Sequence, residues 1–537
     1  MVRLGIDFGT TNTVAAMYDR GLFSVVLHQA QTSRGTIVQE IFPSAILVDP
    51  KTNQRWFGLE ADRKFVELGV SSNLIFIPSL KRQLRDYVEG RALAPSTASE
   101  IGESGKESTG SNFNLAELFT DYLRALADSI RRSHMLTDNE PLETVITWPA
   151  HSNGAQRHIT RECFRKAGFR VINALNEPTA SAIELADCLM AGQRKGNSVE
   201  PYAVAVFDLG GGTFDASVVR IEGNDFHVVA SGGIEKLGGD DFDRILLEMF
   251  QAKLSLPSET MSPLTRYALL RQARSQKELI STGTVKSLCL NPQDFGLSGK
   301  PISISVDFYR EQISPFLNLA VSMLQEIIQS AEHKWAGLNM GSQPLTIYLV
   351  GGSSKLPFVA EMVSEAFPGS HVVLSDKPFQ SVALGAAICA ADRISYHEVF
   401  SRHFGLIRLK DHGRVETFDT IFPAGTPVPR RGESPLEKVA RYAPAHNIGH
   451  LRYLECTSLG PDGMPLKGIR TWSDILFPYD PAYPLSAPVT KDDIISTDRF
   501  AHVEVSEIYR CDSDGVITVE VQNPARNESR LYEIYTD

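Results

Sequence analysis

The chain has 537 residues, of which 42% are hydrophobic and 22% charged, as in an ordinary soluble globular protein. This length exceeds one hydrophobic core and predicts two to four domains. The net charge of −11 argues against nucleic acid as a partner, and no apolar run reaches the roughly 20 residues of a membrane span. A strand begins almost at Met1, so we expect no signal peptide. Six scattered cysteines without a CxxC pair indicate free thiols in a reducing cytoplasm.

Two stretches about 200 residues apart share one pattern. Residues 4–19 (LGIDFGTTNTVAAMYD) and 204–219 (VAVFDLGGGTFDASVV) each predict an apolar strand, an acidic residue, a Gly/Thr-rich turn and a second strand. Such glycines let the backbone approach a ligand and point several N–H groups at one spot. One turn alone is equally compatible with a plain glycine-rich hairpin. The repeat favours a duplicated domain whose halves face each other.

Asp7 and Asp208 lead into these two turns. A carboxylate repels phosphate, but it can hold the water shell of a Mg²⁺ ion that lies between them. Paired hairpins could therefore grip one magnesium polyphosphate, with Thr13 and Thr213 offering hydroxyls to terminal phosphate oxygens. Glu177, at a predicted helix start, is a third acid for this site, although the helix dipole alone would explain an acid there.

The remaining segments add a basic pair, two polar loops and a third glycine turn. Lys81 and Arg82, considered locally, predict a solvated helix face. Residues 95–112 are rich in Ser, Gly and Glu and predict a disordered surface loop, and residues 193–201 predict a hinge. After a buried strand, the turn at 351–357 begins Gly-Gly-Ser, where a flat ring or a ribose could lie against backbone.

Taken in order, the motifs IDFGTTNT, VITWPA, NEPTASA, FDLGGGTFD, LGGDDFD and LVGGSSKLP resemble the ATPase domain of the seventy-kilodalton heat-shock chaperones, the DnaK type. The resemblance covers about residues 2–395. It implies an α/β fold of the actin and sugar-kinase superfamily, in which two lobes with ribonuclease-H-like cores close over ATP. It also implies hydrolysis of ATP to ADP and phosphate, with Mg²⁺ and K⁺ as ions.

The resemblance also implies roles for individual residues. Lys81 would position the attacking water and Thr13 would contact the γ-phosphate. The waters around Mg²⁺ would be held by Asp7, Glu177 and Asp208, with Asp7 and Asp215 near K⁺. The catalytic set would be Lys81, Thr13, Asp208, Glu177 and Asp215. The nucleotide would be bound by Gly9, Thr10, Thr11, Asn12, Gly210, Gly211, Gly212, Thr213, Gly238, Lys277, Glu278, Gly351, Gly352, Ser353 and Lys355.

Three positions depart from the family pattern. Arg274 and Glu278 exchange the acid and arginine that the family has on its adenine-side helix, so arginine stacking on the base would be lost while an i,i+4 ion pair could survive. Asn173 replaces an arginine at the family's contact for J-domain partners. Residues 396–403 replace the acidic, leucine-rich linker that couples the family's two domains.

Residues 404–537 are expected to form a β-rich domain. Residues 420–429 and 503–523 resemble segments of the family's substrate-binding β-sandwich, the latter as two alternating strands around an Asp-Gly turn. Residues 471–488 are rich in aromatics and proline, which predicts either a long surface loop or an exposed partner patch of Trp472, Phe477 and Tyr479. Because the sequence ends at Asp537, we expect no helical lid.

These patterns favour an ATP-dependent, cytoplasmic chaperone-like switch that controls a C-terminal β domain, with an exchange factor and a J-domain protein as further partners. The client would be a polypeptide. One alternative is a nucleotide-gated module for a single dedicated partner. A sugar kinase or an actin-like filament protein would share the fold, but the NEPTASA and LGGDDFD motifs count against both.

Overall fold

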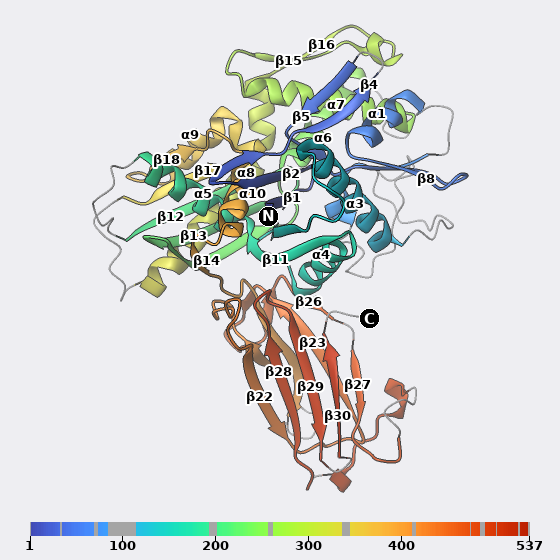
Figure 1. Cartoon of the computed structure of the whole chain (residues 1–537), viewed down its shortest axis with the longest axis vertical. Helices are drawn as coiled ribbons and strands as arrows, with labels where there is room; N and C mark the ends of the chain where they lie inside the picture. The colour runs from blue at the N-terminus through green and yellow to red at the C-terminus, as the bar shows by residue number, and fades with distance from the viewer. Residues whose placement is uncertain are drawn as a thin grey trace. The chain divides into compact units, whose positions relative to one another are not determined.

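The computed structural model describes residues 2–32, 35–68, 74–83, 114–192, 201–255, 261–335, 344–410, 415–472, 474–483, 489–500, 502–524 and 527–534. The chain divides into two compact units, one of residues 1–150 and 161–395 and one of residues 151–160 and 396–537. The first unit is mixed α/β, and the second contains the C-terminal strands (Figure 1). The predicted loop at 95–112, and all of the predicted hinge except Pro201, lie outside the described residues.

The first large sheet of the first unit has the strand order β11-β10-β1-β2-β3, with β6 beside β2. The central strand β1 runs parallel to β10 and antiparallel to β2. β10 reads LETVITW and is buried along its whole length, which suits β-branched residues covered on both faces. The strands are β1 (Arg3–Phe8), β2 (Asn12–Asp19), β3 (Leu22–Val25), β6 (Phe42–Pro43), β10 (Leu142–Trp148) and β11 (Phe169–Asn176).

The second large sheet repeats this topology, with the order β18-β17-β12-β13-β14-β19. Its central strand β12 runs parallel to β17 and antiparallel to β13, as β1 does with β10 and β2. The repeated sequence pattern therefore corresponds to a repeated arrangement of strands. The strands are β12 (Tyr202–Leu209), β13 (Phe214–Glu222), β14 (Asp225–Ile234), β17 (Thr346–Val350), β18 (His371–Leu374) and β19 (Ser395–His397).

Two helices with small side chains join the two sheets. α10 (Ser381–Ala390, SVALGAAICA) is buried at every position and packs on β1, β2 and β10, while α5 (Glu177–Gly192) packs on β12 and β13. The helices cross where Gly385 meets the backbone of Ala180. A Cβ atom on Gly385 would lie only 1.8 Å from the Ala180 carbonyl oxygen. Glycine is therefore required here by close approach, and the crossing holds the sheets at short range.

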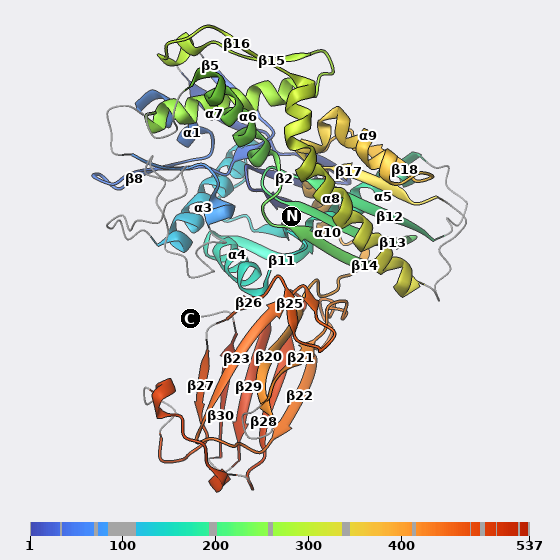
Figure 2. The ribbon, with the colours of Figure 1, turned by 180° about the vertical axis from the view of Figure 1, so that it is seen from behind.

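The other helices and small sheets surround these layers (Figures 1 and 2). α3 begins at a capped end, where the Asn114 side chain accepts the Glu117 N–H at 3.2 Å. The further helices are α1 (Leu59–Leu68), α3 (Leu115–His134), α4 (Gly154–Lys166), α6 (Gly239–Leu254), α7 (Pro263–Ile280), α8 (Val306–Trp335) and α9 (Pro357–Ala366). The further strands are β4 (His28–Thr32), β5 (Gly35–Gln39), β7 (Ile46–Asp49), β8 (Gln54–Phe57), β9 (Ile75–Ile77), β15 (Ser287–Leu290) and β16 (Ile302–Ser305). Short 3₁₀ turns are η2 (Pro292–Phe295) and η3 (Gly352–Lys355).

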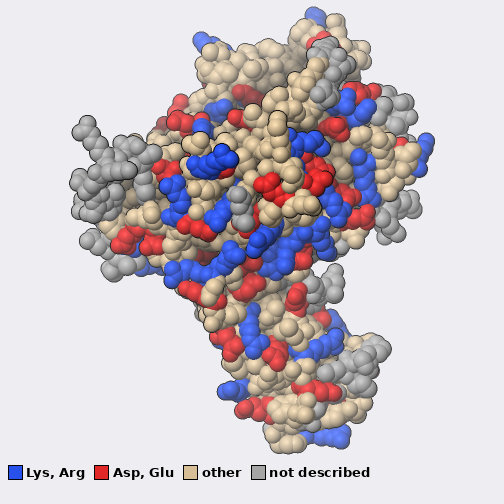
Figure 3. Space-filling model, in the orientation of Figure 1, with Lys and Arg blue, Asp and Glu red and all other residues tan. Residues whose placement is uncertain are grey.

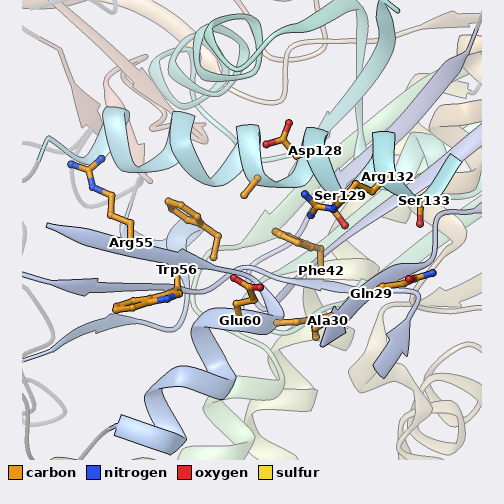
Figure 4. A pocket seen from close by; sticks show the side chains of 13 residues that line it. Gln29, Ala30, Phe42, Arg55, Trp56, Glu60, Asp128, Ser129, Arg132 and Ser133 are labelled. Atoms are coloured by element: carbon orange, nitrogen blue, oxygen red, sulfur yellow. The ribbon is translucent and has the colours of Figure 1, made fainter. Parts of the chain in front are cut away.

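A cavity of about 440 Å³ lies between one face of α3 and the strands β4, β6 and β8 (Figure 4). Its floor carries Phe42 and Trp56, and Arg132 projects from α3 above them. Arg55 at its edge is paired with Glu117 and Asp121. The site residues expected from the sequence are absent from the lining of this cavity, although its Phe42 pairs with Thr13 of β2.

The second unit is a two-layer β-sandwich. One sheet has the order β21-β20-β23-β26 with β27 beside β23, and the other has the order β22-β28-β29-β30. Side chains of both sheets, such as Phe404, Tyr453, Val505 and Val519, share one core. The strands are β20 (His403–Lys410), β21 (Val415–Phe422), β22 (Leu436–Tyr442), β23 (Ile448–Cys456), β24 (Ser458–Leu459), β25 (Pro465–Lys467), β26 (Arg470–Thr471), β27 (Ile475–Pro478), β28 (Val505–Cys511), β29 (Ile517–Asn523) and β30 (Glu528–Glu533). The short turns are η4 (Lys491–Asp493) and η5 (Asp498–Phe500).

The aromatic segment of the second unit corrects one expectation. Phe477 and Tyr479 are 0% and 3% exposed, and Trp472 packs against the same core, so they form no exposed partner patch. The reason is the pairing of β27 with β23, which places alternate side chains of this segment inside the sandwich. The two alternating strands predicted around an Asp-Gly turn are confirmed as β28 and β29. Gly515 in this turn has a φ of 76°, which favours glycine.

The cysteines and the helices bear on two general expectations. All six cysteines are free, as the absence of CxxC pairs predicted. In the described part of the chain, no helix is both long and apolar enough to cross a membrane. Lysines and arginines are interspersed with acidic residues on the face shown in Figure 3, in keeping with the modest net charge.

We predict that Gly385→Ala lowers the free energy of unfolding by about 3 kcal/mol, at the upper end of what overpacking costs. The added methyl group would collide with the Ala180 backbone, which cannot move aside as a side chain can. Urea unfolding measures the change. Gly232→Ala is the matched control, because its Cβ would meet only flexible side chains, Ile327 at 3.3 Å and Met323 at 3.7 Å. Equal losses in both variants would contradict this account of the crossing.

Candidate active site

Both hairpins bring an aspartate to the end of a central strand. Asp7 lies near the end of β1, opposite Val14 of β2, and Asp208 lies near the end of β12, opposite Asp215 of β13. Each strand pair is antiparallel, so the turn that follows the aspartate projects from the sheet end. Because the sheets share one topology, equivalent positions of the repeat occupy equivalent places in the two sheets.

Lys81 joins this group of acids. Its Nζ lies 2.6 Å from the Glu177 Oε1 and 5.8 Å from the centre of the Phe8 ring. Lys81 lies in a short helical stretch at 80–83, and Glu177 begins α5. The side chain that looked locally like a solvated helix face is therefore only 15% exposed. The local interpretation as a solvated face is therefore wrong, and the role of Lys81 in positioning the attacking water stays a prediction.

The electrostatics indicate one tightly coupled cluster of Asp7, Glu177, Asp208, Asp215 and Lys81. Burial raises the pKa of Asp7 to about 6, opposed by Lys81 and by a hydrogen bond with Thr147. Burial also raises the pKa of Glu177 to about 7, with repulsion from Asp7 and Asp215 adding to it. The pKa of Asp208 lies well above its ordinary value, because of burial and then repulsion from Glu177, Asp215 and Asp7.

The cation in the cluster responds in the opposite sense. Burial alone would lower the pKa of Lys81, but attraction to Glu177 and Asp7 outweighs it, so the net pKa is raised. Lys81 is therefore protonated at neutral pH. One ammonium among four buried carboxylates leaves the cluster with excess negative charge, which a divalent cation can neutralise.

Direct metal ligation is a separate question. Within the described ranges, no three His, Cys, Asp or Glu side chains come close enough together to hold a metal ion directly. Mg²⁺ commonly keeps several waters and contacts few carboxylates, so this cluster suits a hydrated Mg²⁺ rather than a dehydrated ion. The donor set is all oxygen, as that ion prefers.

The tips of the two hairpins face each other. A Cβ on Gly211 would lie 2.2 Å from the Thr11 Oγ1, and one on Gly212 would lie 2.4 Å from the Thr10 Cγ2. These glycines therefore permit the close approach of the two tips, while the approach of this backbone to a ligand stays a prediction. Thr213 closes the second turn, because its carbonyl accepts the Gly210 N–H at 3.1 Å.

A second layer of residues supports the Gly210–Thr213 turn. A Cβ on Gly238 would lie 2.7 Å from the Gly211 carbonyl, and the Gly239 N–H donates to the Gly210 carbonyl at 3.0 Å. The Ser353 hydroxyl donates to the same carbonyl at 2.9 Å. Gly351 has a φ of 82°, and a Cβ there would lie 2.5 Å from the Asp208 Oδ1. Gly351 and Ser353 are therefore brought directly to the second hairpin.

Lys277 reaches the same layer, whereas Glu278 does not. The Lys277 Nζ donates to the Gly239 carbonyl at 2.8 Å and lies 2.7 Å from the Asp243 Oδ1. Glu278 is exposed on α7. Arg274 pairs with Asp240 and Asp243, both at 2.9 Å. Burial alone would lower the pKa of the Arg274 guanidinium, but attraction to these two carboxylates, and more weakly to Glu278, raises it.

The first hairpin contains one marked difference from the expectation. Thr13 is 0% exposed, and its hydroxyl accepts from the Tyr122 hydroxyl at 2.8 Å. It also lies 3.2 Å from the Ser44 Oγ. Thr13 is thus committed to the core behind β2, while Thr10 and Thr11 lie at the tip. The turn itself is tight, since a Cβ on Gly9 would lie 2.3 Å from the Asn12 carbonyl oxygen.

Two charged residues of the site were not singled out from the sequence. Arg82 lies 3.4 Å from the Asp241 Oδ2 and 3.7 Å from the Asp240 Oδ2. Asp240 in turn accepts from the Thr11 hydroxyl at 3.2 Å, which ties the first hairpin to the start of α6. The Lys81-Arg82 doublet and the LGGDDFD motif were visible signals, but nothing local shows that they meet.

The cluster predicts how pH changes the stability of the ligand-free protein. Carboxylates whose folded-state pKa is raised bind more protons when folded, so the free energy of unfolding rises as pH falls from 8 towards 5. Asp208→Asn removes one repelling charge, and we expect it to stabilise the fold at pH 8, because burial and repulsion from Glu177, Asp215 and Asp7 disfavour the charged form of Asp208.

Urea unfolding at pH 6, 7 and 8, with EDTA and without nucleotide, measures this effect. Asp225→Asn is the control, because Asp225 is exposed at the start of β14. A loss of stability in Asp208→Asn at pH 8 would mean that the carboxylate is a net stabiliser and that the cluster is not under charge repulsion.

Comparison with known proteins identifies the family. The family model described as Hsp70 protein matches residues 3–398. The Chaperone protein HscA homolog of Vibrio cholerae serotype O1 is 32% identical over 391 residues, which are 72% of this chain and 57% of that relative. The Chaperone protein HscA of Escherichia coli strain HS is 31% identical over 392 residues, with the same two shares. The match thus spans little more than half of these relatives, and on the family model the chain belongs to the Hsp70 family.

Proposed function

We propose that this chain is an ATP-driven switch of the Hsp70 type, in which binding and hydrolysis of ATP at the acidic cluster control the affinity of the β-sandwich for polypeptide. The observation that carries the proposal is the buried Lys81–Glu177 ion pair at 2.6 Å, set among Asp7, Asp208 and Asp215. Buried like charges of this kind are costly and are typical of functional sites.

The proposed fold is a two-lobed, actin-like ATPase with duplicated ribonuclease-H-like cores, followed by a small β domain. Its support is the shared strand order and strand sense of the two large sheets. Each sheet would be the centre of one lobe, with α5 and α10 between them. ATP would then bind where the two hairpin tips face each other, so its entry would require the tips to separate from their contact.

The excess negative charge of the cluster fits a hydrated Mg²⁺, which would neutralise charge on the phosphates. Asp7, Glu177 and Asp208 would hold its waters, and Asp7 and Asp215 would lie near K⁺. The phosphates would be bound by backbone N–H groups of Gly210–Thr213 and by the hydroxyls of Thr10 and Thr11. Because Thr13 is committed to Tyr122, we assign the γ-phosphate contact to Thr10 and Thr11, and Thr13 to support of β2.

Lys81 would orient the attacking water and stabilise charge that develops on the transferred phosphoryl group. Glu177 holds the ammonium in place, so this group needs little reorganisation during reaction. Phosphoryl transfer requires mainly positioning and charge stabilisation, which a fixed cation provides. The nucleoside would lie along Gly351–Ser353, near Lys277 and Lys355.

The β-sandwich is proposed to bind polypeptide. Two of its edge strands carry exposed apolar side chains, with Val415 of β21 44% exposed and Leu531 of β30 61% exposed. An exposed edge strand can pair with an added extended chain. Family membership favours this switch over a sugar kinase or a filament protein. Residues 396–403 differ from the linker that couples the family's two domains. The second candidate function is therefore a nucleotide-gated module that binds a single dedicated partner. The cytoplasmic location of the protein stays a prediction, as do its interactions with an exchange factor and a J-domain protein.

We predict that Lys81→Ala slows single-turnover ATP hydrolysis about 100- to 1000-fold, the loss that follows removal of one well-placed stabilising group. ATP should still bind, because other residues contact the nucleotide. Rapid-quench measurement of phosphate release gives the rate, and calorimetry gives the affinity. Lys64→Ala is the control, since Lys64 pairs with Glu67 on α1 and not with the cluster. An unchanged single-turnover rate would remove Lys81 from the mechanism.

A second prediction separates a general chaperone from a dedicated switch. If the sandwich binds extended apolar peptides broadly, a library of such peptides should stimulate steady-state ATP turnover by the full chain several-fold. If the chain is a dedicated switch, the peptide library should leave its basal rate of ATP turnover unchanged. Turnover that is absent altogether, with no phosphate released from MgATP by the wild-type chain, would reject both versions.

A further inference from the structure

An exposed aromatic ring lies against the glycine turn of the proposed nucleoside site. Phe379 is 44% exposed, although its ring contacts the backbone of Gly352. A Cβ on Gly352 would lie 2.3 Å from the ring Cε1 and 2.9 and 3.2 Å from Cζ and Cδ1. The contact is thus made by one edge of the ring. A large part of the ring is left uncovered, next to the backbone that the nucleoside would follow.

The position of this ring is set by its backbone neighbours. The Gly351 N–H donates to the Pro378 carbonyl at 3.0 Å, which ties the loop before α10 to the glycine turn. The N–H groups of Gln380 and Ser381 both donate to the Lys377 carbonyl, at 2.8 and 3.0 Å. The loop is therefore ordered without a ligand, and covering the ring would cost little conformational entropy.

A cation accompanies the ring. The Lys355 Nζ lies 5.5 Å from the centre of the Phe379 ring, and the side chain is otherwise exposed. An aromatic ring flanked by an ammonium group favours a partner that is flat, has a π-face and carries negative charge nearby. A nucleotide combines these properties, whereas an aliphatic ligand lacks the flat π-face.

The glycine turn connects this ring with the acidic hairpin. Ser353 donates to the Gly210 carbonyl at 2.9 Å, and Gly351 packs on Asp208. The turn therefore extends from the proposed phosphate site to Phe379. We infer that Phe379 is the stacking platform for the nucleotide base, an inference that rests on the proposed ATP-binding function and names a specificity residue within it.

The chemistry of phenylalanine defines what such a platform can select. Its ring has no hydrogen-bond donor or acceptor, so it recognises a base by overlap of flat surfaces. Purines offer more area than pyrimidines, and adenine and guanine offer nearly the same area. Phe379 therefore favours purine over pyrimidine nucleotides and does not distinguish ATP from GTP.

Calorimetry on the full chain tests this, with the Mg²⁺ complexes of ATP, GTP, CTP and inorganic tripolyphosphate as probes. Phe379→Ala should weaken ATP and GTP binding about 5- to 100-fold, the range of one base–aromatic stack, and CTP binding by less. Tripolyphosphate binding should not change. In Phe379→Trp, purine affinity should be kept, and ATP but not tripolyphosphate should quench the new indole fluorescence. Phe308→Ala is the matched control, because Phe308 is 47% exposed at the start of α8.

The outcomes separate this inference from the function on which it rests. If wild type binds MgATP and Phe379→Ala binds it equally tightly, only the base-stacking assignment is overturned. The same holds if Phe379→Ala loses tripolyphosphate affinity as much as ATP affinity, since the ring would then be structural. If wild type binds neither MgATP nor tripolyphosphate, the proposed function fails and the stacking role fails with it.

Discussion

The buried ion pair of Lys81 and Glu177 is the constraint around which the first unit is arranged. Four carboxylates from two sheets and one helix lie around a single ammonium group, and burial raises the pKa of Asp7, Glu177 and Asp208, with repulsion among the acids adding to it at Glu177 and Asp208. Such a charge imbalance costs stability in the ligand-free protein. It is retained at a place where a metal-bound polyphosphate would relieve it, which links the energetics of the fold directly to its proposed chemistry.

Close backbone packing makes this cluster possible. Asp7 and Asp208 belong to different sheets, and they come near each other only because small residues let α5 and α10 cross at short range. Gly5 contributes in the same way, since a Cβ there would lie 2.1 Å from the Ala387 nitrogen. Bulky side chains at these contacts would separate the sheets, and with them the two hairpins.

The second unit uses buried charge for a different purpose. Arg408 lies 2.6 Å from the Glu507 Oε2, and Glu507 is 0% exposed. Tyr442 and Tyr509 donate hydroxyls to the same carboxylate. This network is satisfied by protein groups, and it crosses the sandwich from β20 to β28. A satisfied network of this kind fixes how two sheets pack, because any other alignment would leave a buried charge without its partners.

The repeat, the hairpins and the family could be predicted from the amino-acid sequence alone, because strand periodicity, turn glycines and motif order are local patterns. Lys81 and Glu177 are 96 residues apart, and Thr11 and Asp240 are 229 apart, so their contacts depend on how the sheets pack. Tertiary packing also decides that Thr13 and Phe477 are buried. It places the Phe379 ring against Gly352. A residue's type and spacing indicate what it can do, but only tertiary structure decides which partners it meets, because burial and charge arise from chain segments that are remote in sequence.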